Sequence, residues 1–384
     1  MKIAFITGAR SDYGPFRKTL KAISLDQNYN LDILVHGIHL LDSFGNSINE
    51  IKKDSFGKII KLETITSQEE KSLEMIKTFK VLNNFLNSSS YNLVVIVGDR
   101  LEAYAAALAA HFAKIPILHS GGGHITNGAI DNIYRYNITN LSKYHLATSR
   151  KAYDALRNLT TVNNNNVHFT GSPTVDAIKS YLISPIHIEK YVPNLYKKKY
   201  ILITFHPVTL IKEPVVEIMK AVVEYLSSKN IHMLITYPNN DEKSIEIRSY
   251  IDSIKKDKNT HVVPHLGSNA YFSAIYCSEF VIGNSSSGSM EVPYFKKHVL
   301  NVGARQEGRA LDKSVTNVDA DSVEVIKVLS AILNKDILLL KNEELYGDGT
   351  AIEKTLKILK KIFVKELKNN DWFKKIGNIW RYNN

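Results

Sequence analysis

The segment Gly283–Ser289 of the sequence combines residue types that suit a phosphate group. It reads Gly-Asn-Ser-Ser-Ser-Gly-Ser and follows a short apolar run. Small hydroxyl residues at the start of a helix leave backbone N–H groups free at the positive end of the helix dipole, where an anion binds well. A plain N-cap needs one such residue, whereas this segment has Ser285, Ser286 and Ser287. The segment therefore predicts a phosphate site.

Charged side chains also follow two apolar runs in the first half of the chain. After the first run, Arg10 offers a planar guanidinium that can hold a phosphate with two hydrogen bonds, although a structural turn explains the neighbouring glycines equally well. After the run 93–97 come Asp99, Arg100 and Glu102. Asp99 is also a suitable helix N-cap, a role that does not exclude function. We expect these side chains to face a cleft.

A glycine-rich stretch from His119 to His124 leads to groups suited to proton transfer. His124 can exchange protons near neutral pH, although a lone histidine is more often a loop residue. Asp131 and Arg135 are four residues apart, so on a helix they would share one face and could pair. Such a pair would position either side chain to meet a sugar.

The remaining candidates are His206, Asn239, Glu291 and Arg305, which follow apolar runs of the second half. His206 and Arg305, together with Arg10 and the serines, would neutralise a diphosphate without a metal. The sequence lacks the His/Cys clusters and acidic pairs typical of metal sites. We therefore expect neither a metal nor a cofactor.

The elements that must position these residues are short β-rich runs that alternate with helical stretches. This rhythm is typical of βαβ units and predicts an α/β fold with mostly parallel, doubly wound sheets. The runs form two groups, which for 384 residues predicts two domains with a boundary near residue 180. Ligands of such sheets bind beyond the carboxyl ends of the strands. The runs are 2–7, 32–36, 93–97, 115–118, 144–147 and 167–169, then 200–205, 231–236, 261–266, 280–284 and 298–302.

The composition is that of a folded globular protein, with 44% hydrophobic and 23% charged residues. The first apolar run is too short to span a bilayer and has no secretion-signal pattern, so we expect a cytoplasmic protein. The single cysteine, Cys277, is interpreted as a core residue. The net charge of +11 admits nucleic acid, a membrane surface or a polyphosphate ligand as partner. Because the lysines are scattered and no nucleic-acid module is present, we expect no nucleic-acid partner.

Motifs along nearly the whole chain resemble the UDP-N-acetylglucosamine 2-epimerases. The resemblance is to the hydrolysing branch in particular, which makes N-acetylmannosamine for sialic acid and related nonulosonic acids. The serine segment and GARQEGR at 303–309 are the specific motifs. The others are TGARSDYG at 7–14, GIHLLDSFG at 37–45, VGDRLE at 97–102, GAIDNIYRYNITNLSKYH at 128–145, HPVT at 206–209, YPNND at 237–241 and YGDGTA at 346–351.

The resemblance implies two Rossmann-like domains of the glycosyltransferase-B type. Residues 1–180 would hold the sugar pocket, residues 181–355 would bind the nucleotide, and the closing helix and tail, 356–384, would return to the first domain. The implied UDP-sugar site has Ser285 and Ser286 on the diphosphate, Glu291 on the ribose, Arg10, His206 and Arg305 around the phosphates, and Asp99, Arg100, Asp131 and Arg135 along the sugar pocket.

The implied reaction removes the proton at sugar C2 as UDP leaves C1, and water then adds to the resulting 2-acetamidoglycal with C2 inverted. Asp99 and Asp131 are the carboxylates that could serve it. Where the family has Gly-Gly-Glu, however, this chain ends the triplet with His124, and Tyr136 and Asn140 replace a histidine and a lysine. Either His124 has taken over proton transfer on a sugar that differs at C4 or C6, or the chain binds a UDP-sugar without epimerising it.

Two other activities remain open for a chain of this kind. A glycosyltransferase of the same fold could use the basic, aromatic tail 371–384 to touch a membrane, although packing of the last helix is the preferred interpretation of the tail. A nonhydrolysing epimerase would retain UDP through turnover. The resemblance also implies a homo-oligomer, either a dimer or a tetramer.

Overall fold

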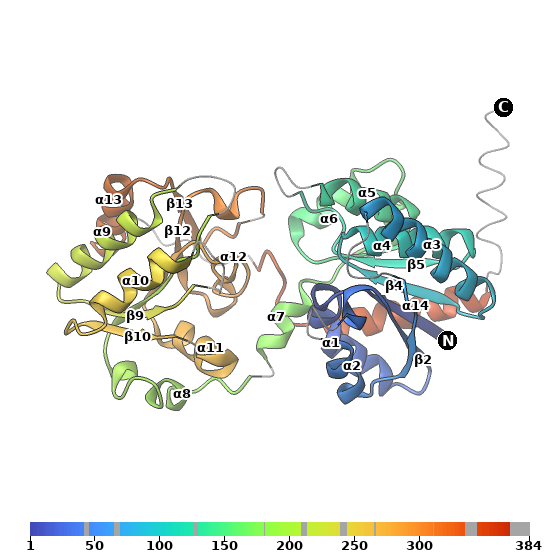
Figure 1. Cartoon of the computed structure of the whole chain (residues 1–384), viewed down its shortest axis with the longest axis horizontal. Helices are drawn as coiled ribbons and strands as arrows, with labels where there is room; N and C mark the ends of the chain where they lie inside the picture. Colours follow the sequence, from blue (N-terminus) through green and yellow to red (C-terminus); the bar gives the residue numbers. More distant parts are fainter. Residues whose placement is uncertain are drawn as a thin grey trace. The chain divides into compact units, whose positions relative to one another are not determined.

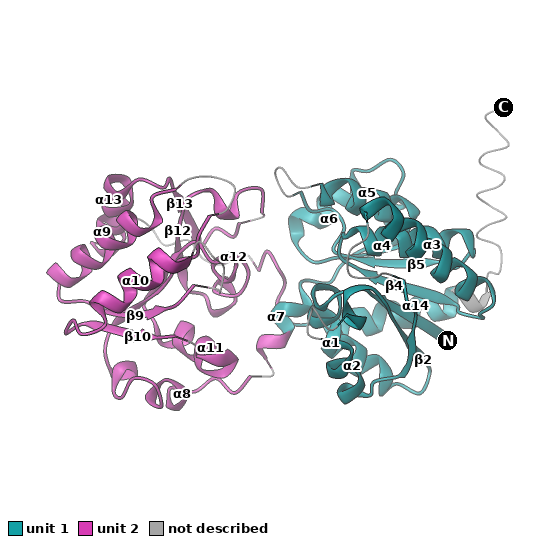
Figure 2. Cartoon of the chain, viewed as in Figure 1, with its two compact units in different colours: residues 1–176, 349–384 teal, residues 177–348 magenta. Residues whose placement is uncertain are grey.

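The chain folds into two compact units, each built around its own parallel sheet. The computed structural model describes residues 1–41, 46–64, 70–125, 130–179, 181–208, 213–238, 244–264, 266–309, 311–334 and 344–368. The first unit comprises Met1–Asp176 and the segment that begins at Gly349, and the second comprises Ala177–Asp348 (Figure 2). The polypeptide therefore leaves the first unit once and returns to it.

The first unit contains a seven-stranded sheet in the order β3-β2-β1-β4-β5-β6-β7, in which all neighbours run parallel (Figure 1). The chain order reverses between β1 and β4, which is where open α/β sheets form a crevice for ligands. The strands are β1 (Lys2–Thr7), β2 (Asn30–Val35), β3 (Lys58–Lys61), β4 (Leu93–Val97), β5 (Ile117–Ser120), β6 (Tyr144–Ala147) and β7 (Val167–Phe169).

Helices cover both faces of the first sheet because successive strand residues point to opposite sides. Ile3 and Phe5 pack with α1, α2 and α14 on one face, and Ala4 and Ile6 pack with α3 and α4 on the other. The helices of this unit are α1 (Arg10–Ser24), α2 (Ile48–Asp54), α3 (Lys71–Asn87), α4 (Leu101–Phe112), α5 (Asp131–Leu141), α6 (Arg150–Arg157) and α14 (Ala351–Lys368), and α7 (Pro173–Ile178) spans the boundary with the second unit.

Helix α14 belongs to the first unit although it comes last in the chain. Ile358, Leu359 and Ile362 are buried in the same core cluster as the side chains of α1. The helix starts where it does because the Asp176 carboxylate accepts the backbone N–H groups of Ala351 at 2.8 Å and of Ile352 at 2.6 Å. An acidic cap from the first pass of the chain thus anchors the returning helix.

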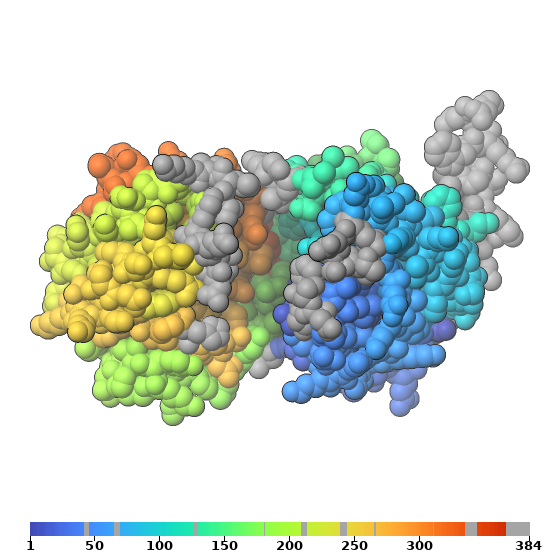
Figure 3. Space-filling model, viewed as in Figure 1, coloured from blue at the N-terminus to red at the C-terminus, as the bar shows by residue number. Residues whose placement is uncertain are grey.

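The second unit has a six-stranded parallel sheet in the order β10-β9-β8-β11-β12-β13, which again reverses next to its first strand. Its strands are β8 (Tyr200–Thr204), β9 (His232–Thr236), β10 (Thr260–Val263), β11 (Phe280–Gly283), β12 (His298–Val302) and β13 (Val315–Val318). Its helices are α8 (Ile186–Glu189), α9 (Val215–Ser228), α10 (Ile245–Ile254), α11 (Gly267–Cys277), α12 (Ser286–Met290) and α13 (Ser322–Leu333). The space-filling view shows α10, in yellow, on the outer surface of this unit (Figure 3).

The predicted α/β class with two doubly wound parallel sheets is confirmed, and each predicted run overlaps a strand. Two strands, β3 and β13, were not predicted. Both lie at sheet edges, where less burial allows lysine, threonine and asparagine within a four-residue strand. The units part between Asp176 and Ala177, and the return to the first unit begins at Gly349, compared with the expected positions of 180 and 356.

Gly283 allows the end of β11 to pass close to β8, which predicts a large effect of adding a side chain there. Its φ is +148°, and a Cβ at this position would lie 1.9 Å from the carbonyl oxygen of Thr204. We expect Gly283→Ala to lower the free energy of unfolding by about 3 kcal/mol or more. Urea unfolding followed by circular dichroism measures this change.

Gly14→Ala is the matched control in the first unit. A Cβ on Gly14 would meet nothing within 4 Å, and Gly14 lies inside α1. Alanine should therefore stabilise this helix by about 0.5–1 kcal/mol. If the two substitutions changed stability alike, the close approach at Gly283 would be contradicted.

Candidate active site

The loops after β1 and β4 lie side by side at the point where the first sheet reverses its order. Asp12, in the first turn of α1, accepts the backbone N–H groups of Gly8 at 3.1 Å and Ala9 at 3.0 Å. A Cβ on Gly98 would lie 3.7 Å from the other Asp12 oxygen, so this carboxyl group lies beside both loops. Burial raises the pKa of Asp12 to about 6. The sequence did not single out this residue, because its pKa depends on burial.

Arg100 and Glu102 form an ion pair at the start of α4. The Arg100 guanidinium donates to Glu102 Oε1 at 3.1 Å. Burial favours the neutral form of Glu102, but this hydrogen bond and the charge of Arg100 hold the pKa of Glu102 below its ordinary value. Nε of Arg100 is buried and, among the described residues, has no hydrogen-bond partner. It is therefore a donor that a ligand could use.

Arg135 joins several parts of the predicted sugar site, but its partner is not the predicted one. Its Nε donates to Asp99 Oδ2 at 2.9 Å and its Nη2 forms an ion pair with the same oxygen. Its Nη1 donates to the carbonyl of His124 at 2.8 Å and to Asn132 Oδ1 at 2.7 Å. Helical spacing offered Asp131 as a possible partner, whereas the carboxylate that the structure places on Arg135 is Asp99, from the loop after β4. Asp131 instead lies in the first turn of α5.

His124 is fixed from two sides. Its carbonyl accepts Arg135, and its Nε2 lies 2.7 Å from Oγ1 of Thr148, which follows β6. The preceding Gly123 has a φ of +80°, and a Cβ there would lie 2.4 Å from the carbonyl oxygen of Ala152. The structure therefore brings Asp99 and His124 together through one guanidinium. Thr148 was missed by sequence reasoning because it lies in another loop and belongs to no motif.

Arg10 is placed differently from the other predicted residues of the first unit. It is the first residue of α1, its side chain is 59% exposed, and it donates to Glu50 at 2.7 Å. An exposed ion pair of this kind contributes little to stability. The guanidinium can therefore exchange Glu50 for a phosphate at small cost.

A cavity of about 440 Å³ opens at the carboxyl ends of the strands in the second unit. Its size is within the range of small-molecule sites. It brings together the predicted residues of this unit that the structure describes: His206, Ser285, Ser286, Ser287, Glu291 and Arg305. Its walls also include Thr204, Thr236, Tyr237, Tyr271 and Phe272, which sequence reasoning did not single out as ligand-binding residues.

Asn284 connects three loops around this cavity. Its side chain accepts the backbone N–H of His206 at 2.7 Å and donates to the carbonyl of His206 at 2.9 Å. Its own carbonyl accepts Arg305 at 3.0 Å and the side-chain amide of Gln306 at 2.8 Å. The loops after β8, β11 and β12 are thus held in one arrangement. Sequence reasoning treated Asn284 as part of the serine segment and missed this role.

The serine segment and its surroundings supply polar groups of different character. Ser285 is the N-cap of α12 and accepts the N–H of Ser287 at 3.4 Å. Ser287 Oγ is buried and lies beside the side chains of Tyr271 and Glu291. Burial raises the pKa of Glu291, and it raises the pKa of Tyr271 to about 12, so the phenol keeps its proton at neutral pH.

Some predicted residues fall outside the described residues. They are Asn239, predicted to bind substrate, and the tail 371–384. Over the ranges that are described, no helix has the length and apolar character needed to cross a bilayer. Within the same ranges, no group of three or more His, Cys, Asp or Glu side chains is arranged to hold a metal ion.

The family of the chain follows from its match to known sequences. The model of the UDP-N-acetylglucosamine 2-epimerase family matches residues 21–360, which is most of the chain. The chain belongs to this family. The predicted membership is therefore confirmed.

Two relatives of this epimerase-family chain align with almost its full length. The UDP-N,N'-diacetylbacillosamine 2-epimerase (hydrolyzing) of Legionella pneumophila is 30% identical over 366 residues, which cover 94% of this chain and 96% of the relative. Polysialic acid biosynthesis protein P7 of Escherichia coli is 28% identical over 382 residues, which cover 97% and 96%. These relatives agree with the predicted hydrolysing branch.

A solved structure confirms the fold of this family member. The crystal structure of UDP-GlcNAc 2-epimerase from Neisseria meningitidis, bound to UDP-GlcNAc, superposes with a TM-score of 0.74 at 17% sequence identity, covering 94% of this chain and 100% of that one. The predicted fold of two Rossmann-like domains of the glycosyltransferase-B type is therefore confirmed.

The raised pKa of Asp12 predicts how this epimerase-family protein responds to pH. Burial moves the pKa from 3.8 to about 6, so between these values the native state holds a proton that the unfolded chain has lost. Stability therefore falls as pH rises through this window, and the loss persists above it. Asp12→Asn removes the charge, so the stability of the variant relative to wild type should rise by about 2 kcal/mol from pH 4 to pH 7. Urea unfolding at each pH measures the difference.

Asp54→Asn is a control of opposite sign in the same unit. Burial opposes ionisation of Asp54, but hydrogen bonds from Arg17 and Tyr13 hold the pKa of its carboxyl below the ordinary value. The relative stability of this variant should fall as pH rises from the acid range. A flat profile for Asp12→Asn would rule out a strained, buried carboxylate at position 12.

Proposed function

We propose that this chain is a hydrolysing 2-epimerase that converts a UDP-2-acetamido sugar to UDP and the free sugar inverted at C2. The observation that carries the proposal is the similarity, along 94% of the chain, to a relative named as a hydrolysing 2-epimerase. The reaction needs donors that stabilise the departing diphosphate and groups that move protons at the sugar. We assign the donors to the second unit and the groups that move protons to the first unit.

We assign nucleotide binding to the cavity of the second unit. Arg305 and the N–H groups at the start of α12 would stabilise charge that grows on the diphosphate as it departs, with Ser285 and Ser286 as hydroxyl donors. His206 would contact the same group, and Glu291 would bind the ribose hydroxyls. Asn284 supports this assignment, because it fixes His206 and Arg305 relative to the serines.

We assign sugar binding and proton transfer to the carboxyl-terminal edge of the first sheet. A base takes the proton from C2 while the C1–O bond breaks and its electrons leave with UDP, which gives a C1–C2 double bond. Water then adds its oxygen to C1, and an acid returns a proton to the opposite face of C2. Asp99, Asp131 and His124 are the groups proposed for these transfers. Arg10, Arg100, Glu102 and Arg135 are proposed to bind and orient the substrate.

His124 is proposed to act where other members have a glutamate. Its contacts with Thr148 and Arg135 fix it beside Asp99, as an acid or base must be fixed to meet one face of a sugar. Because the family's residues are changed around the sugar and retained around the nucleotide, the substrate proposed is UDP-N-acetylglucosamine or a 4-acetamido-6-deoxy relative of it. The Legionella relative is named for a sugar of the second kind.

The pathway, cellular location and oligomeric state of the enzyme are proposed from the same resemblance. The product would enter the synthesis of nonulosonic acids, and one relative is named for polysialic acid biosynthesis. A cytoplasmic location agrees with the single free cysteine, Cys277. A homo-oligomer is proposed because related enzymes commonly self-associate.

The proposed reaction can be tested by NMR in deuterated water. We expect incubation with UDP-N-acetylglucosamine or UDP-diacetamidobacillosamine to release free UDP and a free 2-epimer that carries deuterium at C2. Release of UDP only when an acceptor is added would identify a glycosyltransferase. An epimerised sugar that stays attached to UDP would identify a nonhydrolysing epimerase, and either result would overturn the proposal.

The role of His124 predicts a specific pattern among variants. His124→Gln should lower kcat by about 100-fold or more, because the amide cannot exchange a proton. His124→Glu should retain activity, since it restores a group that titrates. Thr148→Val should shift the pH profile of kcat, and Thr148→Ser should preserve it, because the serine hydroxyl can also contact Nε2.

His232→Gln is the control for these measurements, because His232 lies at the amino end of β9, away from the proposed site. Its kcat and pH profile should match wild type. If His124→Gln and His124→Glu both retained full activity, the assignment at position 124 would be wrong.

A further inference from the structure

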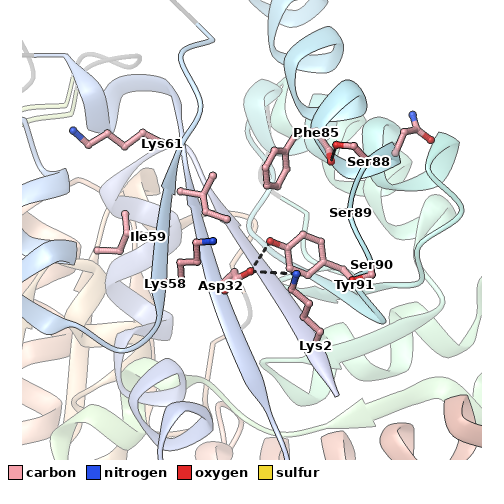
Figure 4. Close-up of a pocket in the computed structure, with 12 residues that line it drawn as sticks. Lys2, Asp32, Lys58, Ile59, Lys61, Phe85, Ser88, Ser89, Ser90 and Tyr91 are labelled. Atoms are coloured by element: carbon pink, nitrogen blue, oxygen red, sulfur yellow. Dashed lines mark hydrogen bonds and ion pairs between the residues drawn. The ribbon is translucent and has the colours of Figure 1, made fainter.

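A cavity of about 710 Å³ lies in the first unit, at the opposite end of its sheet from the candidate active site (Figure 4). It is lined by Lys2 at the start of β1, by Asp32 in β2, by β3, and by the turn that follows α3. The candidate active site follows the carboxyl ends of the strands, whereas this cavity lies toward their amino ends. Its volume is typical of a small-molecule site.

Asp32 is a buried charged residue among apolar neighbours on the face of the sheet that lines the cavity. Its side chain is 5% exposed, and its neighbours on this face include Ala4 and Leu34. The Tyr91 hydroxyl donates to Asp32 Oδ2 at 2.7 Å and the Lys2 ammonium lies 3.8 Å from the same oxygen. Oδ1 of Asp32 receives no hydrogen bond from the residues that the structure describes. Oδ1 is therefore free to accept a hydrogen bond from a ligand.

The turn after α3 adds further acceptors and an aromatic wall. The Ser88 hydroxyl donates to the carbonyl of Phe85 at 2.9 Å, and the Ser89 hydroxyl donates to the carbonyl of Leu86 at 2.7 Å. Their protons are committed to the helix end, so their oxygens can accept hydrogen bonds. The rings of Phe85 and Tyr91 lie 6.4 Å apart beside them. Acceptors next to aromatic faces suit a ring that has hydroxyl groups at its edge and C–H groups on its faces.

The lysines of this cavity give it a positive charge that one carboxylate does not balance. Lys58 is the cross-strand neighbour of Asp32 and reaches toward the space beside it, while Lys61 extends away (Figure 4). Within the described part of the chain, Lys58 makes no ion pair or hydrogen bond. Lys2, in contrast, already contacts Asp32 and lies 4.5 Å from the centre of the Tyr91 ring. The exposed Lys58 ammonium is therefore available to an anionic group of a ligand.

We propose that this cavity binds a monosaccharide that carries an anionic group, either a phosphate or a carboxylate. The anionic group lies against Lys58, the hydroxyls donate to Asp32 Oδ1 and to the serine oxygens, and the ring lies against Phe85 and Tyr91. The site is built from the first unit alone and does not depend on the proposed epimerase activity.

Calorimetry on the full chain with UDP present at saturating concentration tests the proposal. The probes are glucose 6-phosphate, glucuronate, glucose and inorganic phosphate. We expect saturable binding of glucose 6-phosphate or glucuronate, and the stronger of the two identifies the anionic group. Glucose and inorganic phosphate should bind at least about tenfold more weakly. Absence of saturable binding by both charged sugars at millimolar concentration would overturn the proposal, as would phosphate that binds as well as they do.

Two charge-reversal variants locate the binding. Lys58→Glu should weaken the charged sugar by about tenfold or more, because a carboxylate then faces the anionic group. Lys357→Glu, an equal change of charge on the exposed side of α14, should leave the affinity within about twofold. Ser90→Trp fills the cavity from an exposed position without a change of charge and should abolish binding. Equal affinities for Lys58→Glu and wild type would place the ligand elsewhere and contradict the proposal.

Discussion

The Arg135 guanidinium is the interaction on which the first unit's candidate site depends. It is buried, and its bonds join the loop of Asp99, the turn of His124 and Asn132 on α5. A buried guanidinium is stable only when its donors are used, so these loops must take one arrangement for the unit to fold well. The contacts that stabilise the unit are therefore the same contacts that set the geometry of its proposed chemistry.

Asn284 has the corresponding role in the second unit with neutral hydrogen bonds. It connects the loops after β8, β11 and β12, and Gly283 beside it lets β11 approach β8 closely. Asn284 lies where the chain order of the second sheet reverses, between β8 and β11, whereas Arg135 joins the loops after the neighbouring strands β4 and β5. Each residue makes a cross-connection between loops. A polar residue that bonds backbone groups of several loops provides it without filling the cavity.

The sequence predicted the buried strands and the residues that follow them, because these are local features. It missed contacts between residues that are far apart in the sequence. Fully buried strands such as β4 are visible as apolar runs, whereas the edge strands β3 and β13 are short and partly polar. Most of the proposed site residues follow strand ends, which a βαβ pattern reveals. The partner of Arg135 and the contact of Thr148 with His124 come from other loops, and the pKa of Asp12 reflects burial, so no spacing rule could reveal them.

The late position of α14 in the chain sets the order in which the protein can be completed during synthesis. Every residue of the second unit leaves the ribosome before α14 does, so that unit can close its core while translation continues. The first unit has to wait for α14 to cover its sheet, with Asp176 already in place to receive the helix. A chain released early would therefore carry one finished domain and one with an uncovered apolar face, which is the kind of surface that chaperones recognise.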